Sequence, residues 1–582
     1  MQSTLQRVTD SLLAADVGSM WTRVLLIDRV EGEYRFIARG DVPTTLEPPY
    51  SDIAEGVRAA IREIEANTGR QLLEDDGDLI TPEGVDGRGV DLFLVSSSAA
   101  PPLRVAVGGL VGRVSAASAR RAALSIYADI IHTFSLDSPL GRWGHPREAL
   151  GVVEQLLTNW PDAIVLAGGI EGSSDQDLLE LVDAVGLVLE SSPERAAPTL
   201  IYAGNSDRQD DIQERLANVP LMITENIRPT LADERLRTVG RLLEQQFRAR
   251  HLSRLPGVER LRSWGNNEII PTVEAFARVI QYMALSQDKR VLGVDLGAAN
   301  ASLAVTFPNR VAQTLVRTDL GIARDPEALI QKIGAEALAT WVPGFSTPQE
   351  LVTHLMNLLL YPAQQPMTRE TLLLLQGVAR EVLRLLIQDA SGAWPTHYPG
   401  LLPPFDIILG SGTVIREAPR PAQALSIMLD AIQPIGITHF LRDHVSLAPT
   451  IGALADFAPH ISASLVDAQG FESLGLVIAP VGVAQPGDEI LRFRLTQADG
   501  ITEGTVEYGQ LYRFATTHQT LLELRPLRGF DLGLGPGVGA EFSRVGDLVG
   551  FVIDARGRPL AFPSNLQARR RRVEEWLLYV GA

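Results

Sequence analysis

Two short segments, far apart in this chain, carry the same pattern of residues. Leu13–Ser19 reads Leu-Ala-Ala-Asp-Val-Gly-Ser, and Leu292–Ala298 reads Leu-Gly-Val-Asp-Leu-Gly-Ala. Each segment places an Asp at the end of an apolar strand and a Gly two residues later. A second pair follows in the same order, because Asp162–Gly169 resembles Asp406–Gly412. Two different motifs that recur in one order indicate an ancient duplication.

The apolar runs around these motifs predict alternating strands and helices. Leu12–Asp16 and Thr22–Asp28 flank a Gly turn, which is typical of a strand hairpin. The same arrangement returns at Arg290–Asp295 and Ala301–Thr306. Strands that alternate with helices indicate an α/β fold class.

The chain has 582 residues, which is too many for a single hydrophobic core. We expect a first subdomain at 1–115, an α/β insertion at 116–265, a second subdomain at 266–459 and a C-terminal β-rich domain with a closing helix at 460–582. After about residue 460, Gly-rich stretches separate apolar runs of strand length. This abrupt change predicts an all-β region that folds separately.

Composition excludes several classes of function. The absence of cysteine excludes disulfides, zinc–thiolate sites, Cys nucleophiles and iron–sulfur clusters. A formal net charge of -18 argues against nucleic-acid and anionic-membrane partners. Lys289 and Lys332 are the only lysines and neither lies in a Gly-Lys-Ser/Thr loop. Since no signal peptide and no uncharged apolar stretch of ~20 residues is present, we expect a soluble cytoplasmic protein.

The two Asp-x-Gly turns have the chemistry of phosphate-binding loops. Glycine lets the backbone approach a phosphate closely, and nearby N–H and hydroxyl groups can donate to its oxygens. An Asp at each strand end can hold Mg²⁺, so Asp16 and Asp295 are the predicted metal ligands. The alternative for a single motif is an ordinary hairpin turn. The predicted phosphate-binding residues are Asp16, Gly18, Ser19, Thr22, Asp295, Gly297 and Ala298.

A later Gly-rich turn completes the predicted nucleotide site. It follows the strand at Asp406–Leu409 and consists of Gly410, Ser411 and Gly412. Such a turn lets an adenosine ring lie flat against the backbone. Two phosphate loops that face each other would then clamp the triphosphate of ATP from both sides.

These motifs, in this order, resemble the MutL family associated with glutamate mutase, which is unrelated to the mismatch-repair MutL. The resemblance covers about residues 10–456. The segments that carry it are Asp16–Arg23, Ser97–Leu110, Ala119–Leu124, Leu166–Gly172, Tyr202–Asn205 and Asp295–Ala299.

The resemblance implies duplicated actin-like ATPase (ribonuclease H-like) domains of the actin/Hsp70/sugar-kinase type that bind ATP and Mg²⁺. It implies an ATP-dependent chaperone or reactivating factor for a coenzyme-B12-dependent mutase, and whether the chain is a weak ATPase is left open by the sequence. The partner expected from it is that mutase or its subunit, and a homo-oligomer is a further expectation.

The sequence departs from the family pattern in both loops. The family's second loop usually reads Asp-x-Gly-Gly-Ala-Thr-Thr-Asp, whereas Asp295–Ser302 lacks the Thr pair and the second Asp. In the first loop, Met20 stands where a Thr is typical and Arg23 where a Lys is typical. These changes favour an alternative function, an actin-like nucleotide-binding scaffold with little or no hydrolysis. A small-molecule kinase is a third alternative, but the sequence has no sugar-kinase signature.

Overall fold

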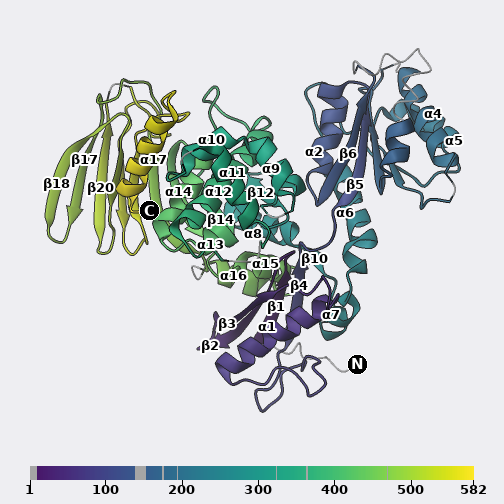
Figure 1. The fold of residues 1–582 in the computed structure, drawn as a ribbon, viewed down its shortest axis with the longest axis horizontal. Coiled ribbons are helices and arrows are strands. Elements are labelled where there is room, and N and C mark those ends of the chain that lie inside the picture. Colours follow the sequence, from purple (N-terminus) through teal and green to yellow (C-terminus); the bar gives the residue numbers. More distant parts are fainter. Residues whose placement is uncertain are drawn as a thin grey trace. The chain divides into compact units, whose positions relative to one another are not determined.

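The structure, a computed structural model, describes residues 9–137, 153–173, 176–192, 194–265, 267–322, 324–345, 347–361, 365–467, 470–527 and 529–582. The chain divides into two compact units (Figure 1). Unit 1 comprises Met1–Ala99, Glu259–Gln313 and Asp319–Ala582. Unit 2 comprises Ala100–Val258 and Thr314–Thr318.

The first sheet of unit 1 has the strand order β10-β4-β1-β2-β3, and β1 runs antiparallel to β2 but parallel to β4. Its strands are β1 (Ser11–Val17), β2 (Trp21–Val30), β3 (Glu33–Pro43), β4 (Leu92–Ser97) and β10 (Ile270–Pro271). Helix α1 (Ile53–Thr68) packs on β2 and β3 through a buried apolar stripe. Asp52 caps this helix by accepting the Ala54 N–H at 2.8 Å.

The second sheet repeats this plan as β13-β12-β11-β14-β15 and then continues into β16-β22-β19. The repeated strands are β11 (Val291–Leu296), β12 (Ala301–Thr306), β13 (Gln313–Arg317), β14 (Ile407–Gly412) and β15 (Gly436–Arg442). Strand β11 is antiparallel to β12 and parallel to β14, as β1 is to β2 and β4. The same strand order is found in both sheets, and this confirms the α/β fold class with duplicated actin-like, ribonuclease H-like halves.

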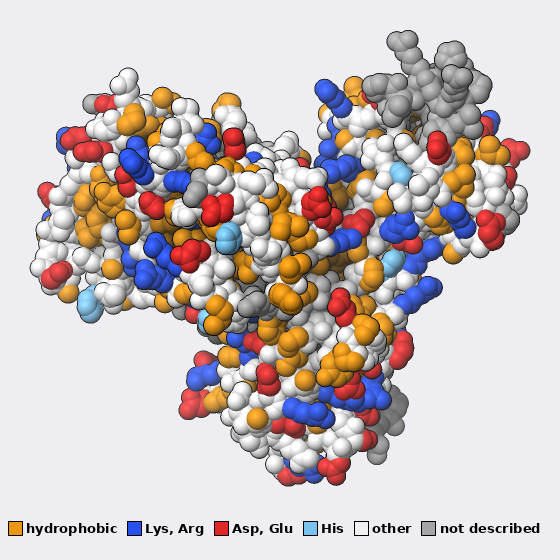
Figure 2. Space-filling view, in the orientation of Figure 1, with side chains coloured by type: hydrophobic (Ala, Val, Ile, Leu, Met, Phe, Trp, Pro, Cys, Tyr) orange, Lys and Arg blue, Asp and Glu red, His pale blue; other side chains and the backbone are white. Residues whose placement is uncertain are grey.

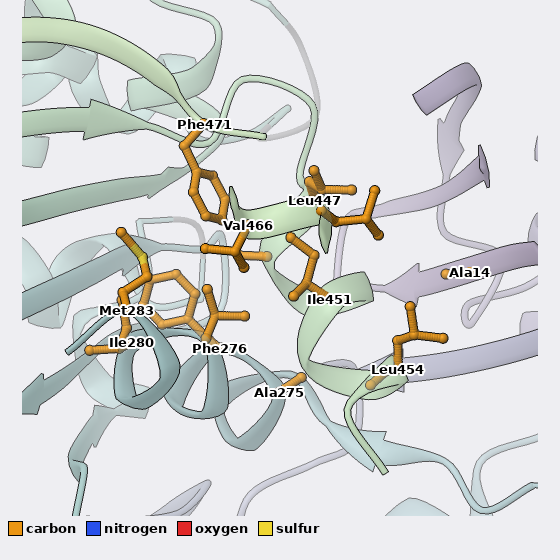
Figure 3. Close-up of a cluster of buried hydrophobic side chains, with 14 of the residues drawn as sticks. Ala14, Ala275, Phe276, Ile280, Met283, Leu447, Ile451, Leu454, Val466 and Phe471 are labelled. Atoms are coloured by element: carbon orange, nitrogen blue, oxygen red, sulfur yellow. The ribbon is translucent and has the colours of Figure 1, made fainter. Parts of the chain in front are cut away.

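Two helices pack together between the two sheets and give the halves a common core (Figure 3). Helix α8 contributes Phe276 and Ile280, and helix α15 contributes Ile451. At the crossing, a Cβ on Gly452 would lie 1.8 Å from the Ala275 carbonyl oxygen, so only glycine fits there.

Besides α1, unit 1 contains the following described helices: α7 (Val258–Gly265), α8 (Thr272–Gln287), α9 (Pro326–Ile333), α10 (Ala335–Trp341), α11 (Pro348–Leu358), α12 (Arg369–Ser391), α13 (Thr413–Arg416), α14 (Pro421–Ile432), α15 (Leu447–Leu454), α16 (Pro459–Asp467) and α17 (Leu566–Val580).

The expected β-rich region after residue 460 is present, and some of its strands extend the second sheet. Strand β16 pairs antiparallel with β15, and β22 and β19 extend the same sheet. Only four strands form a sheet of their own, in the order β18-β17-β20-β21. The strands are β16 (Glu472–Ala479), β17 (Glu489–Gln497), β18 (Gly500–Glu507), β19 (Leu511–Phe514), β20 (Thr520–Pro526), β21 (Ala540–Arg544) and β22 (Gly550–Asp554). The second sheet therefore crosses the boundary proposed at 459/460, and separate folding of the C-terminal region stays a prediction.

Unit 2 is an α/β unit around a parallel sheet with the order β6-β5-β7-β8-β9. Its elements are β5 (Leu103–Gly109), α2 (Ala117–Ala123), β6 (Ala128–Ser135), β7 (Ala163–Ala167), α4 (Gln176–Glu190), β8 (Thr199–Tyr202), α5 (Gln209–Arg215), β9 (Leu221–Ile223) and α6 (Arg237–Arg250). Most of it is inserted in the chain between β4 and β10, and Thr314–Thr318 also belongs to it. The boundaries of the four domains proposed from the sequence stay a prediction.

Acidic and basic side chains are interspersed over the face shown in Figure 2. Among the described residues, no helix combines the length and the apolar character needed to cross a membrane.

Candidate functional site

The two Asp-x-Gly hairpins of unit 1 line one cavity. Asp16 and Asp295 both face it, and so does the turn that follows β14. The predicted residues on its wall are Asp16, Gly18, Ser19, Asp295, Gly297, Ala298, Ser411 and Gly412. Segments from three distant parts of the sequence therefore meet at the ends of β1, β11 and β14.

Two predicted residues lie elsewhere. Thr22 is fully buried, and its hydroxyl lies 2.9 Å from the Thr44 hydroxyl. Gly410 is buried in β14, where a Cβ would lie 2.3 Å from the Met428 sulfur. Close packing against α14 thus explains glycine at position 410 without a ligand.

The two hairpins close with the same hydrogen bond. Gly18 N–H donates to the Trp21 carbonyl at 2.9 Å, and Gly297 N–H donates to the Asn300 carbonyl at 2.9 Å. These glycine amides are therefore used by the turn itself. The N–H groups of Ser19 and Ala298, one residue further on, donate to no backbone carbonyl within the described ranges. They are the amides that each hairpin leaves for a ligand.

Two hydroxyl groups hold the carboxylate of Asp16. Ser96 Oγ and Thr272 Oγ1 each donate to Asp16 Oδ1 at 2.8 Å. Ser96 lies opposite Asp16 in the β1–β4 pairing, and Thr272 begins α8 directly after β10. Both hydroxyl residues are buried. They fix the orientation of the carboxylate, and sequence reasoning missed both because they are distant from Asp16 in the chain.

Asp295 occupies the equivalent place in the second half. Ser411 lies opposite it in the β11–β14 pairing, as Ser96 lies opposite Asp16, and its hydroxyl hydrogen-bonds the carboxylate. Burial, and then the nearby charge of Asp16, raise the pKa of Asp295 to about 6. The two carboxylates therefore interact across the cavity, and a bound cation would relieve that repulsion.

Arg23 brings positive charge to the same place. Its Nε lies 3.2 Å from Asp41 Oδ1, and its Nη2 donates to Thr413 Oγ1 at 3.2 Å. Burial, and then the neighbouring Arg416 guanidinium, lower the pKa of Arg23 to about 10. At neutral pH the side chain is still charged. A charged guanidinium group in the wall of this cavity favours an anionic ligand.

A second, larger cavity of about 350 Å³ adjoins the first. The two share Met20, Trp21, Gly297, Ala298 and Thr413 in their walls. Leucine side chains of α11 and α12 line its far side: Leu358, Leu372 and Leu375. This cavity can take a flat apolar group that is joined to an anion in the first.

The carboxylates of Asp16 and Asp295 can bind Mg²⁺ only if other ligands complete its coordination. Within the described residues, no group of three or more His, Cys, Asp or Glu side chains is arranged to hold a metal ion. Mg²⁺ commonly uses one or two carboxylates and completes its octahedron with water and phosphate oxygens. Asp16 and Asp295 can supply that protein share.

Comparison with known proteins identifies the family to which this chain belongs. A family model described as MutL protein matches residues 12–469, which is most of the chain. The chain belongs to the MutL family. Protein MutL of Clostridium tetanomorphum, another member by name, is 25% identical over 356 residues, which cover 57% of this chain and 69% of that protein. The family-model match over residues 12–469 spans both hairpins of this MutL-family chain and the insertion between them.

Solved structures resemble this MutL-family chain more loosely. A nucleotide-free diol dehydratase-reactivating factor is 9% identical, with a TM-score of 0.30, and the alignment covers 77% of this chain and 99% of that one. The xylulose kinase of Bifidobacterium adolescentis is 12% identical, with a TM-score of 0.26, and the alignment covers 80% and 94%. At these TM-scores the likenesses carry no argument about function.

Proposed function

We propose that this chain binds ATP with Mg²⁺ and acts as an ATP-dependent chaperone or reactivating factor for a coenzyme-B12-dependent mutase. The observation that carries the nucleotide part is the meeting of Asp16, Asp295 and Arg23 at one cavity. Phosphate groups would lie between the two hairpins, where Ser19 and Ala298 offer backbone N–H groups and Arg23 offers charge. The carboxylates of Asp16 and Asp295 would hold Mg²⁺ against the phosphates.

The larger cavity supports a nucleoside in this proposal. It adjoins the phosphate cavity at Thr413, directly after the predicted adenosine-binding residues Ser411 and Gly412. Its leucine-lined wall suits the apolar face of a purine ring, while its polar groups can meet the ribose. Gly410 has a packing role in this proposal and makes no ligand contact.

The mutase part of the proposal rests on membership of the MutL family and on the resemblance of its motifs to the family associated with glutamate mutase. Closure of the two halves on ATP would bias two conformations with different affinities for the mutase. We place this activity in the cytoplasm, where ATP and the mutase meet. Assembly of several copies is part of the same proposal.

One observation favours the second candidate function, a nucleotide-binding scaffold with little hydrolysis. The second hairpin presents Ala298 and Ala299 to the cavity, whereas Ser302 is buried and 1% exposed. No hydroxyl of that hairpin turn can therefore position a water molecule on the phosphate. Both candidates require ATP binding, and they differ in phosphate release and in the partner.

Binding of labelled ATP to the full chain, with and without Mg²⁺, tests the shared part. Asp16→Asn and Asp295→Asn should each weaken Mg²⁺-dependent binding about tenfold or more, since each loses a charged ligand. The matched control is Asp10→Asn, an exposed carboxylate at the opposite end of the first strand, which should bind as the natural chain does. Normal binding by both site variants would reject the site.

A reactivation assay separates the two functions. A coenzyme-B12-dependent glutamate mutase, inactivated by turnover, is mixed with the chain, free coenzyme and ATP with Mg²⁺. Return of mutase activity that depends on ATP supports the reactivating factor. ATP binding without phosphate release and without reactivation would favour the scaffold.

A further inference from the structure

The two hydroxyl groups that hold Asp16 belong to the segments of unit 1 that flank the long insertion Ala100–Val258 of unit 2 in the chain. Ser96 is the penultimate residue of β4, and unit 2 begins at Ala100. The long insertion ends at Val258, and the chain then passes through α7 to β10 and Thr272; a second, short piece of unit 2 is Thr314–Thr318. We call 96–100 the exit segment and 267–272 the return segment.

Both segments are fixed to the same strands of the first sheet. Strand β10 pairs parallel with β4, with Ile270 opposite Ser96. In the exit segment, Ser97 Oγ donates to the Val17 carbonyl at 2.9 Å and Ser98 N–H donates to it at 3.0 Å. Val17 directly precedes Gly18 of the first hairpin. A displacement of that hairpin therefore acts on the exit segment through two hydrogen bonds.

A comparison of the two duplicated halves explains why the exit segment lies beside the proposed nucleotide site. In the second half, β14 leads through Gly412 and Thr413 into α13 and α14, and both residues line the cavity. In the first half, the corresponding strand is β4, and the residues after it lead into unit 2. Ser98 lines the same cavity as Thr413. Unit 2 thus replaces, in sequence order, the helices that follow the adenosine turn in the other half.

We propose that unit 2 is the part of this protein that responds to the nucleotide, with Ser96 and Thr272 as positioning residues that couple Asp16 to the connections at either end of its long insertion. This inference rests on the proposed nucleotide site. A cation on Asp16 changes what the carboxylate can accept from the Ser96 and Thr272 hydroxyls. The backbone at both connections is therefore biased toward one arrangement when Mg²⁺ and ATP are bound, and a partner that binds unit 2 can detect it.

Hydrogen–deuterium exchange of the full chain, with and without ATP and Mg²⁺, tests the coupling. In the natural chain, nucleotide should slow exchange about threefold or more in the exit and return segments, because their backbone is held more tightly. Ser96→Ala and Thr272→Val should each remove most of this change when they are compared with the natural chain at saturating ATP and Mg²⁺. Thr272→Ser restores the hydroxyl and should restore the response.

The matched control is Ser11→Ala, which removes another buried serine hydroxyl bound to a carboxylate, that of Glu83, at the opposite end of β1. Its response to nucleotide should equal that of the natural chain. ATP binding is measured on the same samples by calorimetry. Binding by the natural chain without any change in the two segments would overturn this inference alone. Absence of ATP binding would overturn the proposed function and this inference with it.

If Ser96→Ala or Thr272→Val does not fold, Thr272→Ser compared with the natural chain still tests the coupling, because only the methyl group differs. An unchanged response in Thr272→Ser agrees with the coupling through the hydroxyl. A lost response would overturn it, since the hydroxyl would then be insufficient.

Discussion

Arg23 is the residue on which the charge balance of the cavity depends. It pairs with Asp41 and acts on Asp16 and Asp295 through their charges. We expect Arg23→Ala to weaken ATP binding about tenfold or more and to raise the pKa of Asp295 further, because the cation that opposes it is lost. Isothermal calorimetry measures the affinity.

Arg23→Lys retains the charge and carries the residue typical of the family at this position, so it should keep most of the affinity. The matched control is Arg35→Ala, which removes an exposed arginine paired only with exposed glutamates on the same sheet. Equal affinity in Arg23→Ala and Arg35→Ala would show that Arg23 does not meet the phosphates.

The raised pKa of Asp295, about 6, makes the stability of the ligand-free protein depend on pH. In the unfolded chain this carboxyl loses its proton near pH 4, and in the folded chain only near pH 6. Folding is therefore penalised progressively as pH rises from 4 to 6, and fully above 6. Asp295→Asn removes the charge, so it should melt at a higher temperature than the natural chain at pH 7.5.

The melting-temperature difference between Asp295→Asn and the natural chain should shrink as pH falls from 7.5 to 5. Scanning calorimetry at four pH values measures it. The control Asp10→Asn should show no such trend, because that carboxylate is exposed. A difference that stays constant across the range would show that Asp295 titrates at its ordinary pKa in the folded protein.

At the scale of elements, the crossing of α8 and α15 sets how closely the two halves approach. The Cβ of any residue at 452 would collide with the backbone of Ala275. Gly452→Ala should therefore lower the free energy of unfolding by about 3 kcal/mol, because backbone cannot move aside as a side chain can. Gly392→Ala, at the end of α12 with open space around the added Cβ, is the control and should be nearly neutral. Urea denaturation measures both, and equal stability would show that the helices can separate.

The elements that carry the site were predictable from local pattern. The expected hairpin strands at Leu12–Asp16 and Arg290–Asp295 correspond to β1 and β11, because short apolar runs next to Gly turns specify strands locally. Ser96 and Thr272 were not predictable, since 80 and 256 residues separate them from Asp16. Only the pairing of β1 with β4, and of β4 with β10, brings those hydroxyls to one carboxylate.

The glycines of the Gly410–Gly412 motif show the same limit of prediction from local sequence. Gly410, Ser411 and Gly412 read as one adenosine-binding turn in the sequence, yet only the last two line the cavity. Gly410 makes room for Met428 of α14. A glycine required by packing and a glycine required by a ligand look identical in sequence, because both answer the same need for a missing Cβ.

At the scale of the whole molecule, the composition change near residue 460 does not mark a division of the fold. It reflects Gly-rich turns between short strands, while the pairing of β16 with β15 is a long-range feature that composition does not encode. The apolar cluster between the halves also includes Leu465, Val466 and Phe471, all beyond that point. The C-terminal region therefore extends the second half of the duplication.

Buried ion pairs tie the C-terminal region to the second half. Arg556, after β22, lies 2.8 Å from Asp430 of α14 and 2.8 Å from Asp554. All three side chains are buried, and the arginines nearby hold the pKa of Asp554 far below its usual range. Asp430 also pairs with Arg380, and Asp554 also pairs with Arg558. Loss of Arg556 would leave both carboxylates with one arginine each but would remove charge-assisted hydrogen bonds, each of which contributes about 1.5–3 kcal/mol. Arg556→Ala should therefore lower the melting temperature strongly, whereas Arg571→Ala, on the exposed face of α17, should not.

A chain that ends at Pro459 tests the same connection on a larger scale. It would lose the strand that pairs with β15, the residues of α16 that fill the core between the halves, and Arg556. We expect this shortened chain to aggregate on expression and to bind no ATP, because an unpaired strand edge and core side chains would face water. In the full-length Arg556→Ala variant, calorimetry should still give one unfolding transition at a lower temperature. A soluble shortened chain that binds ATP normally, or an Arg556→Ala variant that melts in two steps with only one of them shifted, would show that the C-terminal region is energetically independent after all.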